Sequence, residues 1–414
     1  MARAPRIRLA GLCLFVATLA IAHASLYAWT TPPWHLFDEE QHVDYAMSLR
    51  DRRLPEITDD IHQGIIDDAV ATHRWATFGL PQPRSTRVEE LGLEGRSYEA
   101  YQPPLYYALG AVAILPAGHD AARALWWMRA LSVVFAGVMA ALVVLVTWEA
   151  IGAPANPSRF VATGGVFVAL LPSFAQAGGR ASNDIAVAAA VLATAACALA
   201  WARRGTTKFA LLTGACAAAA CLTKASGLIA IVIVVLVAFR RRAWRPAVFA
   251  MALPIAAVVA WALVTWARYG VLEGSRAFIE YVRFVPRPWK LLARSARPSV
   301  LGTTVLMESQ RNGANAWTLA IVGLAVPLAA IGGWCARRLA SAMVALIVVA
   351  SIGVTVVAFA EGLEVGVMSR LVLPAVAAVA ALVGAGATRR ALRAPASVLV
   401  IATAAMACWY HAQL

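Results

Sequence analysis

Long apolar segments separated by short polar loops restrict what this chain can fold into. A helix needs about 20 apolar residues to cross the hydrocarbon core of a bilayer, and a spanning segment cannot leave its backbone amides unpaired. Apolar residues make up 61% of the 414 positions and charged residues only 14%, whereas soluble domains average about 45–50% and about 25%. The sequence therefore predicts an all-α polytopic membrane protein, with residues 1–414 forming a single integral membrane domain.

About eleven segments are apolar enough to be predicted as transmembrane helices. They lie at residues 9–29, 127–148, 160–177, 185–202, 209–222, 228–239, 248–266, 317–334, 339–359, 371–385 and after 393. The apolar run at 103–115 is shorter and carries tyrosines that suit the headgroup level, so we expect a juxtamembrane helix there. Two long polar loops remain, at residues 30–126 and 268–315.

Clusters of arginine predict the orientation of these segments. If the N-terminus is cytoplasmic, every short loop with a basic pair or triplet falls inside, as the positive-inside rule requires. The two long loops then lie outside, so we expect a plasma (inner) membrane protein with an extracytoplasmic active site. The net charge of +14 is explained by these topology signals, and we expect no nucleic acid partner.

The first outer loop concentrates the acidic residues. Residues 27–126 hold fifteen of the twenty-two acids, and Asp38, Glu39 and Glu40 follow the first span directly. Ionisable groups near hydrocarbon are costly and mark functional sites by default. Asp38 also suits the N-cap of a helix, with Gln41 as its partner, so capping and catalytic roles are both open.

Several residues around Asp38 have the chemistry of a catalytic or metal site. On a helix Asp38, His42 and Tyr45 share one face, and a carboxylate near a hydroxyl can act as a general base. A divalent metal ion shared between Asp38 and Asp184 is one interpretation, because such ions take oxygen ligands. Asp184 alternatively begins a span, where negative charge is favourable. No zinc signature is present, and the six cysteines form no Cys-x-x-Cys pair.

Two cations are predicted on the outer side. Lys224 lies in a short hairpin, where it either snorkels to the surface or meets an anionic headgroup. Arg370 begins a span from the outside, which the positive-inside rule disfavours. A phosphate partner is therefore the favoured interpretation for Arg370.

Five short motifs occur in an order that resembles a known family. They are Asp38-Glu39, Gln102-Pro103-Pro104-Leu105-Tyr106-Tyr107, Ser182-Asn183-Asp184, Thr223-Lys224-Ala225-Ser226-Gly227 and Ser369-Arg370-Leu371-Val372-Leu373-Pro374. Together they resemble the GT-C superfamily of polyprenyl-phosphate-sugar-dependent glycosyltransferases, with protein O-mannosyltransferases and lipid A aminoarabinose transferases as the nearest groups. Gln102 departs from the pattern, because the family often has His or Lys at this position.

This resemblance implies a fold, a reaction and a set of site residues. The fold would be GT-C-like, with juxtamembrane helices in the first outer loop. The enzyme would move a hexose or pentose from a polyprenyl-phosphate donor to an extracytoplasmic hydroxyl of a lipid, glycan or protein, with inversion. The implied residues are Asp38 and Glu39 for catalysis, Lys224 and Arg370 for the donor phosphate, His42, Tyr45, Tyr101, Gln102 and Tyr106 for the substrates, and Asp38 with Asp184 for a metal ion.

Two other functions remain open at this point. A flippase or transporter of lipid-linked sugars would carry ionisable residues within its spans and broken helices near the midplane. A catalytically inactive assembly subunit would keep the same fold without the reaction. The concentration of charge at one outer face favours the enzyme.

Overall fold

The computed structural model describes residues 3–35, 38–74, 87–88, 91, 95–242, 244–272, 274, 276–277, 314–360 and 373–412. Within these residues every regular element is a helix, and one isolated β-bridge joins Asp60 to Arg96. The all-α prediction is therefore confirmed for the part of the chain that is described.

Each predicted span corresponds to a helix or to a pair of helices. These are α1 (Arg3–Thr30), α6 (Ala121–Ala150), the pair α7 (Thr163–Leu170) and α8 (Pro172–Gly179), α9 (Asp184–Arg204), α10 (Thr207–Thr223), α11 (Ile229–Arg241), α12 (Trp244–Tyr269), α16 (Ala314–Cys335), α17 (Arg338–Ala360), α19 (Leu373–Ala387) and α20 (Arg393–His411). Among the described residues, five helices are long and apolar enough to cross a bilayer, or six if the bent pair counts as one. The number of eleven spans stays a prediction, because helices such as α11, with 13 residues, are only about 20 Å long.

The third span is broken rather than continuous. Helices α7 and α8 meet at an angle of 66°. Pro172 occupies the first turn of α8, and Leu171 before it is extended, with φ −69° and ψ 125°. A proline disfavours helical dihedrals in the preceding residue and cannot donate a backbone hydrogen bond, so the break follows from the sequence.

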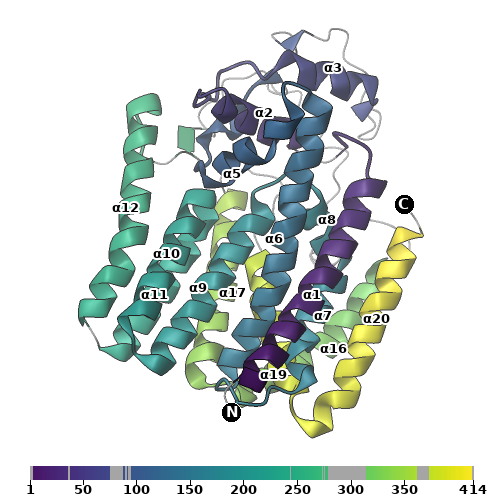
Figure 1. The fold of residues 1–414 in the computed structure, drawn as a ribbon, viewed down its shortest axis with the longest axis vertical. Coiled ribbons are helices and arrows are strands. Elements are labelled where there is room, and N and C mark those ends of the chain that lie inside the picture. The colour runs from purple at the N-terminus through teal and green to yellow at the C-terminus, as the bar shows by residue number, and fades with distance from the viewer. Residues whose placement is uncertain are drawn as a thin grey trace.

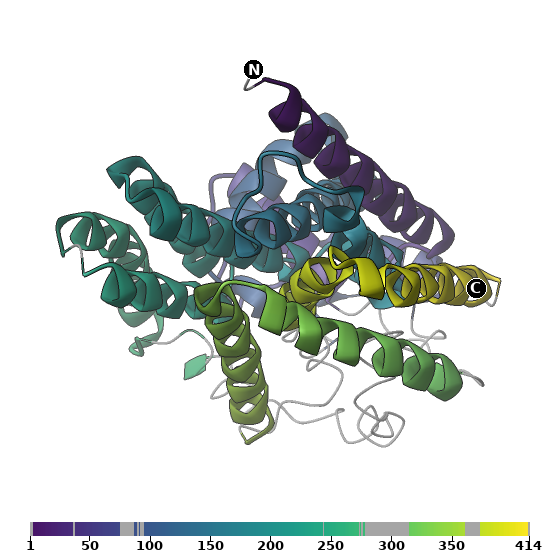
Figure 2. The ribbon, with the colours of Figure 1, turned by 90° about the horizontal axis from the view of Figure 1, so that it is seen from below.

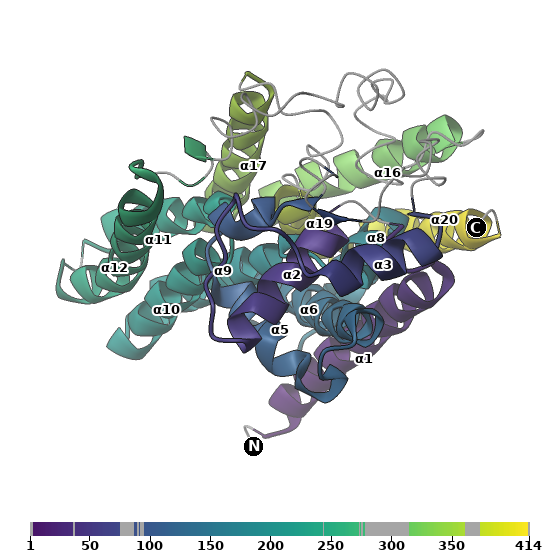
Figure 3. The same ribbon diagram turned by 90° about the horizontal axis from the view of Figure 1, so that it is seen from above.

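Short helices from the first long loop lie over one end of the bundle (Figure 1). They are α2 (Glu39–Arg50), α3 (Gln63–Ala71), α5 (Leu105–Ala113) and the 3₁₀ turn η3 (Tyr98–Tyr101). Helix α2 packs against α5 and α6, and α5 also contacts α10, as Figure 3 shows from above. The helix expected at 103–115 is thus confirmed as α5, and its position at the membrane surface stays a prediction. We call the end of the bundle that these short helices cover the capped end.

The opposite end, which carries the N-terminus (Figure 1 and Figure 2), gathers the basic clusters. Glu149 at the end of α6 accepts hydrogen bonds from Arg203 at 2.8 and 2.9 Å and from Arg204 at 3.3 Å. The backbone amide of Arg337 donates to Ala150 O at 2.9 Å. Arginines from separate loops therefore share one end, as the topology prediction requires, while the membrane face that this end meets remains a prediction.

Small residues allow the helices to approach closely. A Cβ atom on Gly164 of α7 would overlap the carbonyl of Ala380 in α19. Buried alanines are numerous in α9, α10 and α19, and α9 packs against both of the other helices. In lipid, where the hydrophobic effect does not drive helices together, close backbone approach of this kind stabilises their association through van der Waals contacts. It thereby fixes the helices whose ends lie at the capped end.

Candidate active site

The acidic run after α1 divides into residues with different surroundings. Glu39 is fully buried. Its Oε1 accepts from Arg129 Nε at 2.8 Å and from the amide of Ala181 at 3.1 Å, while its Oε2 accepts from Arg129 Nη2 at 2.7 Å. Arg129 also donates to three carbonyls at the end of α1 and beyond, those of Ala28, Thr31 and Pro32. This arrangement favours a positioning role for Glu39 over direct chemistry.

Two further carboxylates of α2 hold the long loop in place. Glu40 is buried against Arg74 in an ion pair. Asp44 accepts from His62 Nδ1 at 2.6 Å and from Ser97 Oγ at 2.7 Å. The hydrogen bond with Asp44 raises the pKa of His62 above its usual value, against the opposing effect of burial. These contacts stabilise the loop on α2 and leave Asp38 as the acid with a different environment.

Asp38 lies at the start of α2 in the left-handed region, with φ 67° and ψ 5°. Its side chain makes no capping hydrogen bond, so the predicted capping role of this side chain is wrong. The Tyr98 hydroxyl donates to Asp38 Oδ1 at 2.5 Å. Burial raises the pKa of Tyr98, and the negative charge of Asp38 raises it further. Left-handed residues other than glycine are uncommon and cluster at functional sites, and Asp38 is also only partly buried.

The structure brings Asp38 and Asp184 to the same region, around Tyr101. Burial raises the pKa of the Tyr101 phenol, and the charges of Glu99, Asp38 and Asp184 raise it further. Asp38 comes from the start of α2, Tyr101 from η3, and Asp184 from the start of α9. Residues far apart in the chain therefore converge at the capped end.

Asp184 belongs to a compact charged cluster. Its Oδ1 accepts from Lys224 Nζ at 2.5 Å. Its Oδ2 accepts from Ser182 Oγ at 2.6 Å and from Arg180 Nη2 at 3.0 Å. Lys224, at the end of α10, therefore has an acidic partner that does not neighbour it in the sequence.

This cluster does not fit the metal ion that was considered for Asp38 and Asp184. Both oxygens of Asp184 already accept hydrogen bonds, two of them from cations. A divalent cation would have to approach Lys224 and Arg180 against their repulsion. The described residues also contain no group of three or more His, Cys, Asp or Glu side chains placed to hold a metal.

The remaining predicted substrate residues form a buried aromatic layer. The Tyr45 ring stacks on Tyr107 with centroids 4.0 Å apart, and its hydroxyl donates to the carbonyl of Gln102 at 3.2 Å. His42 Nδ1 lies 2.9 Å from the Tyr107 hydroxyl, and the Tyr106 hydroxyl lies 2.9 Å from Ser132 Oγ. Because these side chains contact one another beneath the site, they support it, and their contact with substrate stays a prediction.

One arginine of the predicted site lies outside the described residues, and two arginines near the site were not predicted. Arg370 lies outside the described residues. The sequence interpretation overlooked Arg129 and Arg180, which pair with Glu39 and Asp184. A signal was available for both, because each is an isolated cation beside or within an apolar segment, where an ionisable residue needs a partner.

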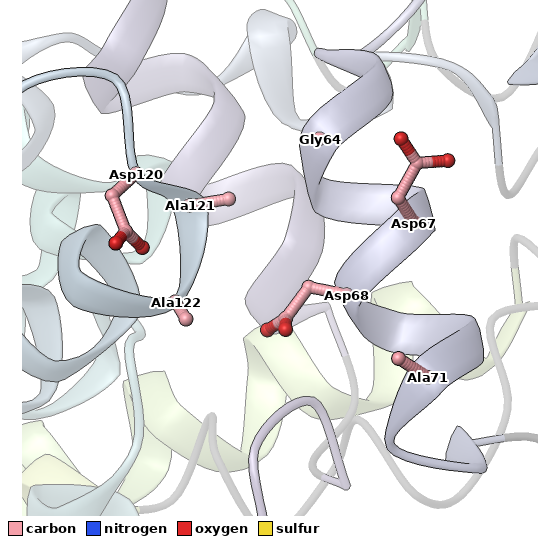
Figure 4. A pocket seen from close by; sticks show the side chains of 7 residues that line it. All are labelled: Gly64, Asp67, Asp68, Ala71, Asp120, Ala121 and Ala122. Atoms are coloured by element: carbon pink, nitrogen blue, oxygen red, sulfur yellow. The ribbon is translucent and has the colours of Figure 1, made fainter.

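A separate cavity of 340 Å³ opens between α3 and the start of α6 (Figure 4). Its lining residues are Gly64, Asp67, Asp68, Ala71, Asp120, Ala121 and Ala122. Asp68 accepts from Trp34 Nε1 at 2.6 Å, and Asp120 caps α6 by accepting from the amide of Arg123 at 2.9 Å. These acids have structural roles, and none of the predicted site residues lines this cavity.

A family model and several solved structures resemble this chain. The model described as dolichyl-phosphate-mannose-protein mannosyltransferase matches residues 110–271, which include Asp184 and Lys224 but not Asp38. No curated protein matches the sequence significantly.

The solved structures resemble the chain in fold. The Archaeoglobus fulgidus oligosaccharyltransferase tethered to an acceptor peptide has a TM-score of 0.52 at 11% identity, covering 97% of this chain and 55% of that one. The same organism's oligosaccharyltransferase AglB, in complex with an inhibitory peptide and a dolichol-phosphate, has a TM-score of 0.50 at 10% identity, with coverage of 91% and 50%. ArnT from Cupriavidus metallidurans bound to undecaprenyl phosphate reaches only 0.35 at 14% identity, with coverage of 92% and 78%, too low for an argument.

These likenesses concern the fold, because every identity is low. The chain spans about half the length of the oligosaccharyltransferase chains that it matches. The family model covers two of the five motifs, those at Ser182–Asp184 and Thr223–Gly227, and the helical fold is shared with the oligosaccharyltransferases. They confirm the resemblance of this chain to the GT-C glycosyltransferases.

Proposed function

We propose that this protein transfers a sugar from a polyprenyl monophosphate donor to an acceptor hydroxyl on the extracytoplasmic side of the membrane, with inversion. One observation carries the proposal. A partly exposed carboxylate, Asp38, and a cluster in which Lys224 and Arg180 both donate to Asp184 converge around Tyr101 at the capped end of an apolar helical bundle. A base and a phosphate site on one face are what such a transfer needs.

Asp38 acts as the general base in this reaction. It takes the proton of the acceptor hydroxyl while that oxygen bonds to the anomeric carbon. Tyr98 holds the carboxylate through its 2.5 Å hydrogen bond, which orients it toward the acceptor. A positioned base of this kind contributes about 10²–10⁴-fold to the rate.

The charged cluster stabilises the leaving group. The bond from the anomeric carbon to the phosphate oxygen breaks, and the polyprenyl phosphate departs with the electron pair. Lys224 and Arg180 lie where they can meet the growing charge on that oxygen, an electrostatic contribution that is large in a site shielded from water. Asp184 keeps both cations in place, and Arg370 remains a further predicted phosphate ligand.

A transporter of lipid-linked sugars is the second candidate, and one feature favours it. The break between α7 and α8 lies beside His23, a buried histidine of α1. Its Nδ1 is 2.8 Å from the carbonyl of Ala169, and its Nε2 is 2.9 Å from His411 Nε2. Broken helices with ionisable residues nearby are typical of transporters. The charged groups around Asp38, however, gather at one end rather than along a path.

The test replaces Asp38 by Asn. Asn adopts left-handed dihedrals readily and can accept the hydrogen bond from Tyr98, so folding should be preserved. Transfer from a labelled polyprenyl-phosphoryl sugar in proteoliposomes should fall by about 10²–10⁴-fold, while the melting temperature stays close to that of the parent. Tyr98→Phe, which only loosens the base, should cause a smaller loss.

The outcome distinguishes the two candidates. Near-normal transfer by a stable Asp38→Asn protein would overturn the mechanism. Movement of the lipid-linked sugar across the bilayer without transfer would favour the transporter instead.

A further inference from the structure

Asn183, immediately before Asp184, has an unusual environment. It is fully buried, and its Nδ2 lies 3.3 Å from the carbonyl of Thr223 and 3.3 Å from the hydroxyl of Tyr107. A backbone carbonyl can only accept a hydrogen bond, so the NH₂ group must face Thr223, which determines the orientation of the amide. Its Oδ1 is buried and meets no hydrogen-bond donor among the described residues.

Gln102 presents a second acceptor of the same kind. It is 3% exposed, and its Oε1 is buried without a donor in the described part of the chain. Its side chain contacts Tyr101, while its carbonyl accepts from Tyr45, which stacks on Tyr107. Asn183 through its side chain and Gln102 through its backbone carbonyl therefore contact opposite members of one pair of stacked tyrosines.

This position connects both acceptors to the proposed reaction. Tyr101 is in contact with Gln102, and the negative charges of Asp38 and Asp184 both raise the pKa of Tyr101. Asn183 is next in sequence to Asp184, whose cluster with Lys224 is the proposed phosphate site. Each acceptor is therefore carried by a residue next to a member of the proposed site, Gln102 beside Tyr101 and Asn183 beside Asp184.

A buried acceptor without a donor is unfavourable, so a ligand that brings a donor to these oxygens would be bound more tightly. Sugar hydroxyls are donors, and they are carried beside the phosphate in a glycosyl phosphate. Neither oxygen would attract the phosphate itself, which presents further acceptors. The chemistry of the pair therefore suits a polyol rather than an anion.

We propose that Asn183 Oδ1 and Gln102 Oε1 accept hydrogen bonds from hydroxyl groups of the donor sugar, so that they recognise the sugar while Lys224 and Arg180 hold the phosphate. This inference rests on the proposed function. A role in specificity follows, because a sugar that lacks the matching hydroxyl leaves a buried acceptor unpaired.

The experiment compares the affinity for undecaprenyl phosphate with the affinities for its mannosyl, glucosyl, galactosyl and arabinosyl esters, in detergent-purified protein. The parent should bind at least one ester roughly threefold to tenfold more tightly than undecaprenyl phosphate, the value of one or two neutral hydrogen bonds. Asn183→Ala should lose this preference and keep its affinity for undecaprenyl phosphate.

Tyr107→Phe is the matched control, because it removes the hydroxyl that Asn183 contacts but keeps Oδ1 and the stacked ring. It should retain the preference for the glycosylated probe. Gln102→Met, which keeps the size of the side chain, should reduce the preference and provides the measurement if Asn183→Ala does not fold.

The results distinguish recognition of the sugar from a purely structural role of the two acceptors. If Asn183→Ala and Gln102→Met keep the preference, or lose affinity for all the probes equally, the acceptors are structural and the inference fails. A parent that binds undecaprenyl phosphate but prefers no ester would also overturn it while preserving the phosphate site. A parent that binds none of these probes would overturn the proposed function itself.

Discussion

The ion pair between Glu39 and Arg129 provides the sharpest test of how this site is built. The sequence resemblance implied a catalytic role for Glu39, whereas the structure buries it against Arg129, with side-chain exposures of 0% and 1%. We predict that Glu39→Gln mainly destabilises the fold. Asp38→Asn, one residue away, should mainly slow transfer.

The magnitude follows from the contacts. Removing one partner of a buried ion pair costs about 3–5 kcal/mol, because the other charge is left buried and uncompensated. Glutamine keeps one acceptor, but its NH₂ group faces Arg129 in either orientation, because both oxygens of Glu39 accept from Arg129. The carbonyls of Ala28, Thr31 and Pro32 still accept from Arg129. We therefore expect the lower part of the range, about 3 kcal/mol.

The assay is reversible unfolding in mixed micelles, followed by tryptophan fluorescence, beside transfer measured on the folded fraction. The matched comparison is Arg129→Met alone and combined with Glu39→Gln, which measures the coupling between the two side chains. Arg129→Met also removes the donor to the carbonyls of Ala28, Thr31 and Pro32, so the double variant should be less stable than the parent but should lose less stability than the sum of the two single variants. A Glu39→Gln protein as stable as its parent but unable to transfer sugar would refute this reasoning and make Glu39 a catalytic residue.

Three further predictions concern the loop, the phosphate site and the topology. The hydrogen bond with Asp44 raises the pKa of His62, so the stabilising contribution of His62 is complete below its unfolded pKa of about 6.5 and is lost as pH rises through the raised folded value. Over that window, hydrogen exchange of the loop in the parent should accelerate beyond the intrinsic pH dependence of amide exchange. A His62→Gln protein should show the intrinsic dependence alone. Lys224→Gln should weaken undecaprenyl phosphate binding by roughly tenfold to a hundredfold, the value of a charged hydrogen bond, and unchanged affinity would remove Lys224 from the site. In a background without native cysteines, an impermeant thiol reagent added to intact cells should label Gly64→Cys and not Thr207→Cys, both exposed positions at opposite ends of the bundle; the reverse pattern would contradict the predicted orientation.

The helices could be predicted from the sequence because hydropathy is a local property. Each apolar segment carries the signal for its own helix, and Pro172 carries the signal for the break in the third one. The short helix α5 was predictable for the same reason, since its apolar run is too short to span a bilayer. The number of helices that truly cross the membrane was less accessible, because short helices such as α11 depend on how their neighbours surround them.

The site was predictable only in part. The sequence indicated Asp38, Asp184 and Lys224 as residues of interest, because each is ionisable beside an apolar segment. It did not indicate that Asp184 and Lys224, forty positions apart, would meet each other. Consequently a lysine that looked unpaired and an aspartate that looked available to a metal neutralise each other.

By itself, the sequence determined that this chain is a helical membrane protein with an acid-rich first loop, since the lengths of apolar segments and the spacing of arginines decide those features locally. Only the tertiary structure decided how the surroundings of these acids differ. Glu39, Glu40 and Asp44 are each buried against a cation or a histidine from elsewhere in the chain, while Asp38 is left-handed, partly exposed and held by Tyr98. The physical reason is that burying a carboxylate requires a partner, and partners are assigned by packing between segments that are distant in the sequence.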